Sequence, residues 1–206
     1  AKIAGYIQYC KKHDIDVLPP DINRSQVRFT AEGRTIRFGM GAVKNAGVQA
    51  VEAIVQARGD QPFTDFFEFF RRINLDQVNR RVVESLVKAG AFDSLGETRQ
   101  TLLGAIEQAM DSIAQDKKRN VAGQVSLFDL GGEAEKAQQQ LVKLKQQPEF
   151  PPDVLLAMER EMTGVYISGH PLDGVRDLLE QLPANTLMVA QAAEEEVPGG
   201  LRDGDK

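Results

Sequence analysis

The sequence has few of the side chains from which metal centres and active sites are usually built. Its 206 residues include one cysteine, Cys10, and two histidines, His13 and His170. A single cysteine excludes an internal disulfide framework and fits a reducing compartment. Cys10 and His13 share an expected helical face, but zinc needs about four ligands and no second pair follows. We therefore expect no metal site, no catalytic residue and no cofactor in this chain.

Several longer patterns are also absent. No apolar run is long enough to span a membrane, and no charged-then-apolar signal segment opens the chain. Neither a Walker-type phosphate loop nor a nucleophile elbow occurs. Asp14 and Asp16 imitate the carboxylate pair of a nucleotidyl transferase, but they precede Pro19 and Pro20 in an expected polar loop without a third carboxylate. These absences predict a cytoplasmic protein with no membrane contact and no independent enzymatic activity.

The negative charge is distributed unevenly along the chain. The total of −5 divides into +1 over residues 1–33, +2 over residues 34–100 and −8 over residues 101–206. An acidic total disfavours a protein that coats nucleic acid by bulk charge. A small local site in the middle third, where basic residues gather, remains compatible with these numbers.

Hydrophobic periodicity predicts a mainly α fold with a short β-hairpin near residues 27–38. The two arms of that hairpin, Val27–Phe29 and Thr35–Phe38, alternate apolar and polar residues around Glu32 and Gly33. Phenylalanines at 63, 66, 67 and 70 then follow at helical spacing, with Thr64 placed to cap the helix. The simplest interpretation of that stripe is core packing.

Later helices carry clear start and stop signals. Asn79 is a good N-cap for a helix over residues 80–89, and Gly90 supplies a left-handed stop. Thr98 is placed to cap a long amphipathic helix, and Pro151 and Pro152 favour another helix start. Lys, Gln, Gly and Glu dominate between these last two helices, which predicts a linker.

The most informative segment is Lys44–Val55. A turn that contains Asn45 and Gly47 leads directly into an apolar helix, and both residue types tolerate a left-handed backbone. A helix that opens from such a turn points free N–H groups and its positive dipole end forward, which suits phosphate. Small residues leave the backbone accessible, while Lys44 and Gln49 are placed to add side-chain contacts. The candidate DNA-binding residues here are Lys44, Asn45, Ala46, Gly47, Gln49 and Ala50.

A second, looser copy of this pattern follows about forty residues later. Glycine turns and basic residues again precede an apolar helix. Two such hairpins would contact both backbones of a duplex across the minor groove, with modest, salt-sensitive affinity. The alternative is a pair of plain helical hairpins whose glycines are C-caps. The candidate residues in this copy are Lys88, Gly90, Ala91, Leu95, Gly96, Thr98 and Arg99.

The linker contains one unusual peptide, Gln124–Asp129. It has polar surroundings but includes the large apolar pair Leu127 and Phe128, which is costly to expose unless it docks into a pocket. Gln124, Ser126 and this pair resemble the short peptide by which bacterial replication proteins bind the sliding clamp. The alternative is that Leu127 and Phe128 pin the linker to its own domain.

Five segments occur in an order that resembles one known family. They are Val17–Ser25, Ile36–Lys44, Val78–Glu84, Gly90–Gly96 and Gly164–Leu172. Together they are similar to the alpha subunits of bacterial DNA polymerase III, the family C replicative polymerases. Asn45 stands where the hairpin motif usually has glycine, and it can adopt the same left-handed conformation.

This resemblance implies a fragment of a longer protein with four parts. Residues 1–33 would be the end of the polymerase fingers, 34–115 a tandem helix-hairpin-helix domain, 116–150 a flexible linker with the clamp peptide, and 151–206 a helical segment that leads to an OB domain. The palm, with its Mg²⁺-binding aspartates, would precede residue 1, so this piece would lack polymerase activity.

The partners implied by the resemblance are double-stranded DNA, held without sequence preference, the sliding clamp (beta subunit) and other replisome subunits. The expected location is the bacterial cytoplasm, in association with the nucleoid. A helical protein-protein interaction module without DNA binding is the alternative function.

Overall fold

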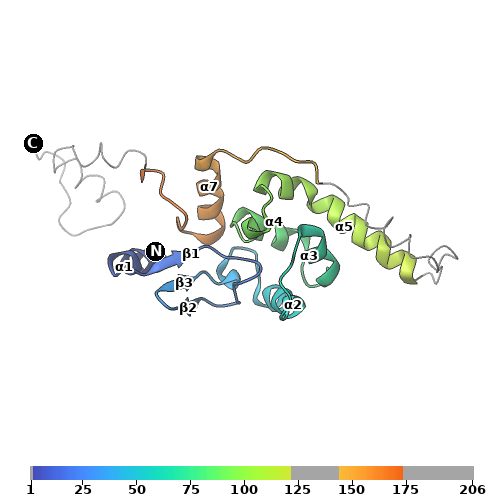
Figure 1. Cartoon of the computed structure of the whole chain (residues 1–206), viewed down its shortest axis with the longest axis horizontal. Helices are drawn as coiled ribbons and strands as arrows, with labels where there is room; N and C mark the ends of the chain where they lie inside the picture. The colour runs from blue at the N-terminus through green and yellow to red at the C-terminus, as the bar shows by residue number, and fades with distance from the viewer. Residues whose placement is uncertain (1, 122–143, 174–206) are drawn as a thin grey trace, which may run out of the picture. The chain divides into compact units, whose positions relative to one another are not determined.

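The computed structural model describes residues 2–121 and 144–173 of the chain (Figure 1). The chain divides into two compact units, residues 1–168 and residues 169–206. In the first unit, the elements are α1 (Lys2–Lys12), β1 (Asp16–Leu18), β2 (Thr30–Glu32), β3 (Thr35–Arg37), the 3-10 helix η1 (Met40–Ala42), α2 (Val48–Arg58), α3 (Phe66–Arg72), α4 (Arg80–Lys88), the 3-10 helix η2 (Asp93–Leu95), α5 (Arg99–Val121) and α7 (Pro152–Thr163). The predicted mainly α fold is confirmed.

The described part of the second unit is a short turn. The His170 amide donates a 2.6 Å hydrogen bond to the Asp173 carboxylate, and the Asp173 amide donates to the His170 carbonyl at 2.9 Å.

A small three-stranded sheet has the strand order β1-β3-β2. β2 and β3 run antiparallel, with Ala31 opposite Ile36, around a turn in which Gly33 has a positive φ of 64°. The predicted hairpin is therefore present, but its first strand is Thr30–Glu32 rather than Val27–Phe29. The prediction of a polar loop before Pro19 and Pro20 is wrong for Asp16–Leu18, because these residues form strand β1 and pair in parallel with β3. A three-residue edge strand that ends before Pro19 avoids the lost hydrogen bonds that exclude proline from a sheet interior.

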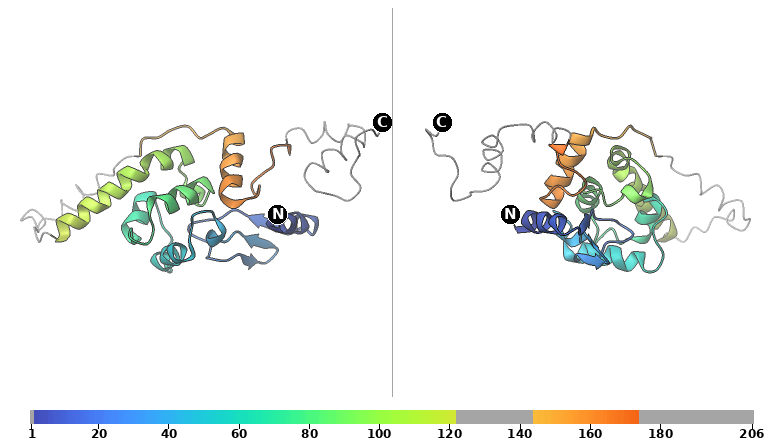
Figure 2. Two further views of the ribbon diagram at one scale, coloured as in Figure 1. Left: turned by 180° about the vertical axis from the view of Figure 1, so that it is seen from behind. Right: turned by 60° about the vertical axis from the view of Figure 1, so that its left-hand side comes forward.

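Three helices of the first unit, α3, α5 and α7, gather with α4 into one cluster. Helix α4 contacts α5 on one side and α7 on another, and α3 also packs against α5 (Figures 1 and 2). The expected boundary between residues 33 and 34 lies within the β2–β3 turn. α7 packs against α4, which precedes it by more than sixty residues, and this contact brings distant residues to the hairpins described below.

Five phenylalanines form the centre of the core. Phe66, Phe69 and Phe70 come from α3, Phe63 precedes that helix, and Phe92 lies before η2; each is at most 2% exposed. Phe92 meets Phe69 and Phe66 edge-on, with centroid distances of 4.9 and 5.3 Å. Burial of one such ring stabilises the fold by about 1.5–3 kcal/mol. The core interpretation is confirmed for this stripe, except that Phe67 is half-buried and Phe69 replaces it at the centre.

The start of α3 differs from the prediction that Thr64 caps it. Asp65 is the N-cap, because its carboxylate accepts the Glu68 amide at 2.7 Å. Thr64 instead donates its amide and hydroxyl to the Glu68 carboxylate at 2.5 and 2.6 Å. This is a variant of the capping box, in which the side chain at the third helical position bonds to the amide of the N-cap residue. Here the Glu68 carboxylate bonds to the amide of Thr64, the residue before the N-cap.

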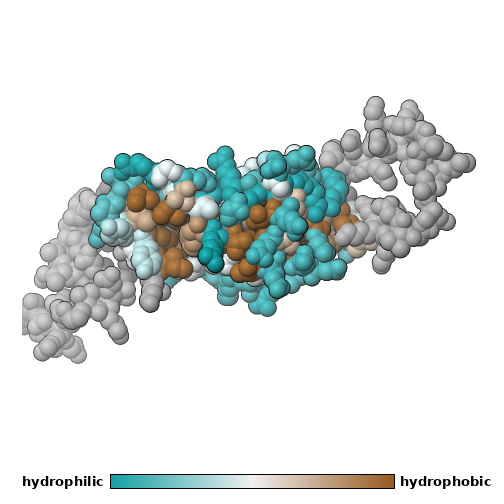
Figure 3. Space-filling model, turned by 90° about the horizontal axis from the view of Figure 1, so that it is seen from below, coloured by the Kyte–Doolittle hydropathy of each residue, from teal (hydrophilic) through white to brown (hydrophobic). Residues whose placement is uncertain are grey.

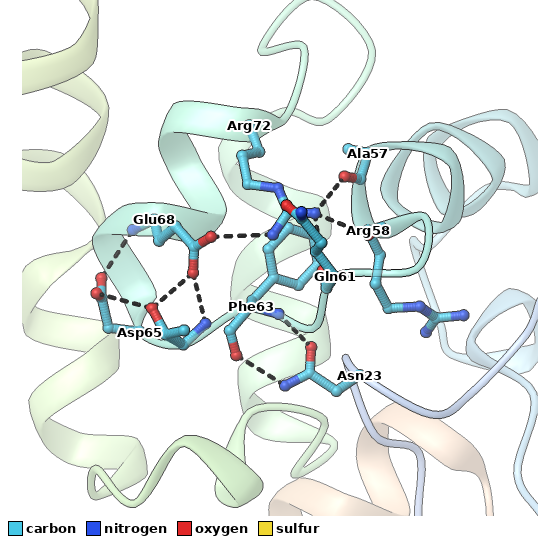
Figure 4. A network of polar contacts seen from close by, with 9 residues as sticks. Asn23, Ala57, Arg58, Gln61, Phe63, Asp65, Glu68 and Arg72 are labelled. Atoms are coloured by element: carbon cyan, nitrogen blue, oxygen red, sulfur yellow. Dashed lines mark hydrogen bonds and ion pairs between the residues drawn. The ribbon is translucent and has the colours of Figure 1, made fainter.

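A polar network joins the end of α2 to α3 (Figure 4). The Arg72 guanidinium donates to the carbonyls of Ala57, Arg58 and Gln61 at 2.7–2.8 Å and lies 4.7 Å from the centroid of the Phe63 ring. Arg72 therefore binds two carbonyls in the last turn of α2, where a helix cannot satisfy its own acceptors, and one in the turn that follows.

On the face drawn in Figure 3, apolar residues show as separate patches between hydrophilic ones. Within the described ranges, the large hydrophobic side chains that are exposed are Ile3, Tyr6, Tyr9, Phe29, Val48 and Leu172. Val48 is of interest because it belongs to the first candidate hairpin.

Candidate nucleic-acid interface

The first candidate hairpin has the backbone that the sequence predicts. Asn45 adopts the left-handed conformation with φ 64°, and Gly47 is the extended N-cap of α2. The first backbone bond of α2 runs from the Val51 amide to the Gly47 carbonyl at 3.1 Å. The amides of residues 48–50 precede that bond, and Gly47 makes no side-chain cap. The start of α2 therefore offers N–H groups and the positive end of its dipole to an anion.

Side chains of this hairpin divide between its surface and the core. Lys44, Asn45, Gly47 and Gln49 are exposed. By contrast, Ala46 and Ala50 are only 3% and 6% exposed, so they pack inward. Their smallness lets the turn lie close to the core, whereas sequence reasoning assigned them to an open phosphate-facing surface.

Val48 belongs to the apolar helix that the sequence predicts after the turn, but its side chain is 53% exposed. It lies between the exposed Gly47 and Gln49 at the first position of the helix. The tip of the first hairpin therefore presents one apolar side chain among its polar neighbours.

Two hydrogen bonds from distant elements hold the first turn in place. The Lys44 amide donates to the Met162 carbonyl of α7 at 2.7 Å. The Asn45 side-chain amide donates to the Ser85 hydroxyl of α4 at 3.0 Å. Because these contacts point inward, they fix the turn without occupying the amides at the start of α2.

The second candidate hairpin repeats the order of helix, left-handed turn and helix. α4 ends with Ala89 as its C-cap, and Gly90 and Gly96 have φ values of 83° and 84° on either side of η2. The Thr98 hydroxyl accepts the Thr101 amide at 3.1 Å, which confirms Thr98 as a cap of α5. Within this hairpin, Gly96 is exposed and Lys88, Leu95 and Thr98 are half-buried.

Arg99 lies inside the second hairpin and is only 6% exposed. Its guanidinium makes two bonds to the Asp93 carboxylate, at 2.7 and 3.0 Å, and donates to the Lys88 carbonyl at 3.0 Å. Burial lowers the pKa of Arg99, but the bond to Asp93 and the charges of Asp93, Glu159 and Glu149 outweigh it and raise the pKa above its ordinary value. Arg99 is thus a permanent cation that closes the turn, and its guanidinium is already paired.

Gly90 and Ala91 contribute to the same closed turn. A Cβ atom at Gly90 would come within 2.3 Å of the Arg99 guanidinium, and its φ is positive, so glycine is required there on both counts. Ala91 is fully buried, and its carbonyl accepts the Ile22 amide at 2.7 Å. Gly90, Ala91 and Arg99 therefore build the hairpin, while the exposed Gly96 and the half-buried Lys88 and Leu95 form its accessible side and the Thr98 hydroxyl is bonded to the Gln147 carbonyl.

The start of α5 holds an anion supplied by the chain itself. The Glu149 carboxylate accepts the Arg99 amide at 2.8 Å and the Gln100 amide at 3.4 Å. Sequence reasoning missed this contact, because Glu149 lies about fifty residues further on, beyond a linker-like stretch with no periodicity. A carboxylate at the first amides of a helix is the arrangement that its dipole favours. The two candidate hairpins thus differ: one helix start has no side-chain cap and the other has a carboxylate.

Other candidate chemistry finds no support in the described residues. Asp14 and Asp16 are both exposed, and Asp16 begins β1. No group of three or more His, Cys, Asp or Glu side chains in residues 2–121 and 144–173 could hold a metal ion. None of the helices in those ranges has the length and apolar content to cross a membrane. The candidate clamp residues Gln124, Ser126, Leu127 and Phe128 lie outside the described residues.

Comparison with known proteins gives consistent matches. Residues 14–102 match the family model of a helix-hairpin-helix motif. DNA polymerase III subunit alpha of Mycobacterium tuberculosis (strain H37Rv) is 42% identical over 180 residues, which cover 86% of this chain and 15% of that protein. The subunits of Vibrio cholerae and Bacillus subtilis are 38% and 35% identical, over 84% and 93% of this chain and 15% and 17% of their own lengths. The chain therefore spans only about a sixth of the length of these relatives.

Proposed function

Because the chain belongs to the family of DNA polymerase III alpha subunits, we propose that it is a non-catalytic segment that grips the backbone of duplex DNA without reading its sequence. The observation that carries this proposal is the start of α2, whose amides follow a left-handed Asn45 and have no side-chain cap. Backbone amides at a helix start bind phosphate oxygens and carry no base information.

The first hairpin would supply most of the grip. Lys44 is exposed beside the turn, and Gln49 adds a polar side chain in the first turn of α2. Val48, exposed between them, would face the sugars of the minor groove rather than a charged phosphate. Small Ala46 and Ala50 would contribute indirectly, since they allow the turn to pack closely on the core.

The second hairpin would make a weaker contact through its accessible side. Lys88 and Gly96 are the residues from which we expect contacts with DNA, with Leu95 beside them, and Thr98 would join them only when its bond to the Gln147 carbonyl is broken. Gly90, Ala91 and Arg99 would act by holding the turn in shape. Few phosphates would be neutralised in total, so affinity would be low and strongly dependent on salt.

Titration of duplex DNA against salt tests this proposal. We expect binding in the micromolar range or weaker with little sequence preference. Lys44→Glu should weaken binding about tenfold at about 50 mM salt and reduce the slope of log K against log salt by about 0.9, because one phosphate contact is lost. Adding Lys88→Glu should reduce both further.

Lys12→Glu is the matched control, since Lys12 is an exposed lysine on α1, outside both hairpins. The same charge change there should leave the slope near its original value. If Lys44→Glu and Lys12→Glu weaken binding equally, the hairpin grip is wrong and only bulk charge matters.

We further propose that the peptide Gln124–Phe128 tethers the parent polymerase to the sliding clamp. A clamp contact and a duplex contact on one chain would reinforce each other through effective concentration. Binding of the whole chain to a bacterial beta clamp should be lost when Leu127→Ala and Phe128→Ala are combined. Retained binding would assign Leu127 and Phe128 to packing within their own protein. Membership of a bacterial replisome, in the cytoplasm at the nucleoid, follows from the same proposal.

A helical protein-interaction module without DNA binding is the competing function. It predicts no salt-dependent binding of duplex by the wild-type chain, so the titration separates the two functions directly.

A further inference from the structure

Residues 144–150, here called the strap, lie across the start of α5. Besides the Glu149 contacts, the Thr98 hydroxyl donates to the Gln147 carbonyl at 2.9 Å, and the Gln147 amide donates to the Thr101 hydroxyl at 2.9 Å. The Gln146 side chain adds a bond to the Glu97 carboxylate at 2.8 Å. The strap therefore covers the position in the second hairpin that corresponds to the uncapped helix start of the first.

We propose that the strap competes with duplex phosphate for the start of α5, so that Glu149 restrains the second hairpin from gripping DNA. This inference rests on the proposed function. In chemical terms, the Glu149 carboxylate and a phosphate oxygen are both anions that accept the same amides, those of Arg99 and Gln100. One helix start cannot give these two donors to both acceptors at once.

The strap is held in a way that permits release. Glu149, Pro148 and Gln146 are exposed, and the bonds from Gln146 to Glu97 and from Gln100 to Glu149 lie at the surface. The bonds of Gln147 to Thr98 and Thr101 are partly buried, and the half-buried Leu144 is the apolar residue of the strap that packs on the core. Segments with exposed hydrogen bonds and little apolar burial belong to the least stable parts of a fold. Phosphate would exchange one set of hydrogen bonds for another, while Arg99 stays paired with Asp93 underneath.

The geometry also explains why one hairpin differs from the other. Gly47, the N-cap of α2, has no side chain, and none of the described residues caps that helix start. In the second hairpin, Thr98 and Glu149 together satisfy the first amides of α5. The first hairpin is therefore ready for phosphate, whereas the second is ready only when the strap is displaced.

Two measurements on the whole chain test the strap. Glu149→Gln keeps the side-chain shape and removes the charge, and it should raise affinity for a short duplex about fivefold, the size expected of one anion at a helix start. The matched control is Glu161→Gln, an exposed glutamate on α7 that loses the same charge elsewhere. In the wild-type chain, saturating duplex should also speed hydrogen exchange of the Gln147 amide, because that amide loses its Thr101 partner.

The outcomes separate the strap from the grip itself. If Lys44→Glu weakens binding as proposed but Glu149→Gln behaves like Glu161→Gln, the strap proposal is overturned and the grip stands. Unchanged or slower exchange at Gln147 with duplex bound overturns it as well. If Lys44→Glu has no more effect than Lys12→Glu, the grip is wrong and the strap proposal falls with it.

Discussion

Asn45 should make two separable contributions to stability, one from its backbone and one from its side chain. Its φ of 64° is left-handed, and its side-chain amide donates to the Ser85 hydroxyl, which belongs to a residue that is only 3% exposed. A left-handed conformation costs an ordinary residue about 1–2 kcal/mol relative to glycine. One hydrogen bond contributes about 1 kcal/mol, and a buried hydroxyl left unpaired costs about 1–3 kcal/mol.

These magnitudes predict an order of stabilities. Asn45→Gly keeps the backbone and loses the bond, so we expect a loss of about 1–2 kcal/mol in the free energy of unfolding. Asn45→Ala loses the bond and strains the turn, so we expect about 2–3 kcal/mol. Ser85→Ala should cost about 1 kcal/mol, because it also removes the buried hydroxyl.

Urea unfolding followed by circular dichroism measures these values, with the midpoint and the slope fitted for each variant. The control is Gln49→Ala, an exposed neighbour that should change stability by no more than about 0.5 kcal/mol. The double variant Asn45→Ala with Ser85→Ala should cost less than the sum of its parts, since the two side chains share one bond. Equal stabilities of Asn45→Ala and Asn45→Gly would refute the backbone argument, and strict additivity would refute the bond.

Two further predictions concern the network between α2 and α3. Arg72→Ala removes three bonds to carbonyls near the end of α2 and should cost about 2–3 kcal/mol in urea unfolding. The exposed Arg71→Ala should stay within about 0.5 kcal/mol, and equal losses in the two variants would show that the carbonyl bonds of Arg72 do not stabilise the fold. The hydrogen bonds from Thr64 lower the pKa of Glu68, and Arg72 contributes less. The stability that Glu68 supplies is therefore present above its unfolded pKa of about 4.3, and it is lost as pH falls through the lower pKa of the folded state. Glu68→Gln should therefore flatten the decline in urea midpoint between about pH 6 and pH 3, and an unchanged decline would contradict the assignment.

Local signals in the sequence identified most of the helix ends correctly. Asn79 caps α4 by accepting the Val82 amide at 3.1 Å, Gly90 is left-handed, and α7 begins at Pro152. Each of these outcomes depends on the residue itself and on neighbours within one turn, so the sequence contains the necessary information. The left-handed Asn45 belongs to the same class.

Contacts between distant segments were beyond the sequence patterns. Strand β1 forms only because β3 pairs with it, and Asp16–Leu18 alone has too few residues to show an alternation. Arg99 was predicted to face DNA, but it is buried and its guanidinium is bonded to Asp93 and to the Lys88 carbonyl. Glu149 caps α5 from fifty residues away. In each case a partner from a distant part of the chain determines the role of the residue, and its local sequence alone favours a different role.

The surroundings of Arg99 argue that the two hairpins are unequal partners for DNA. Asp93 pairs with it directly, and the charges of Glu159 from α7 and Glu149 from the strap also raise its pKa. Three carboxylates therefore surround one buried cation, and Glu97 adds a fourth carboxylate near the start of α5. Negative charge at this density opposes a phosphate unless the strap leaves and takes Glu149 with it. At the first hairpin, by contrast, Lys44 is exposed beside an uncapped helix start. For the proposed grip, electrostatics and hydrogen bonding thus favour the same sequence of events, in which the first hairpin would engage the duplex and the second would follow only after the strap is displaced.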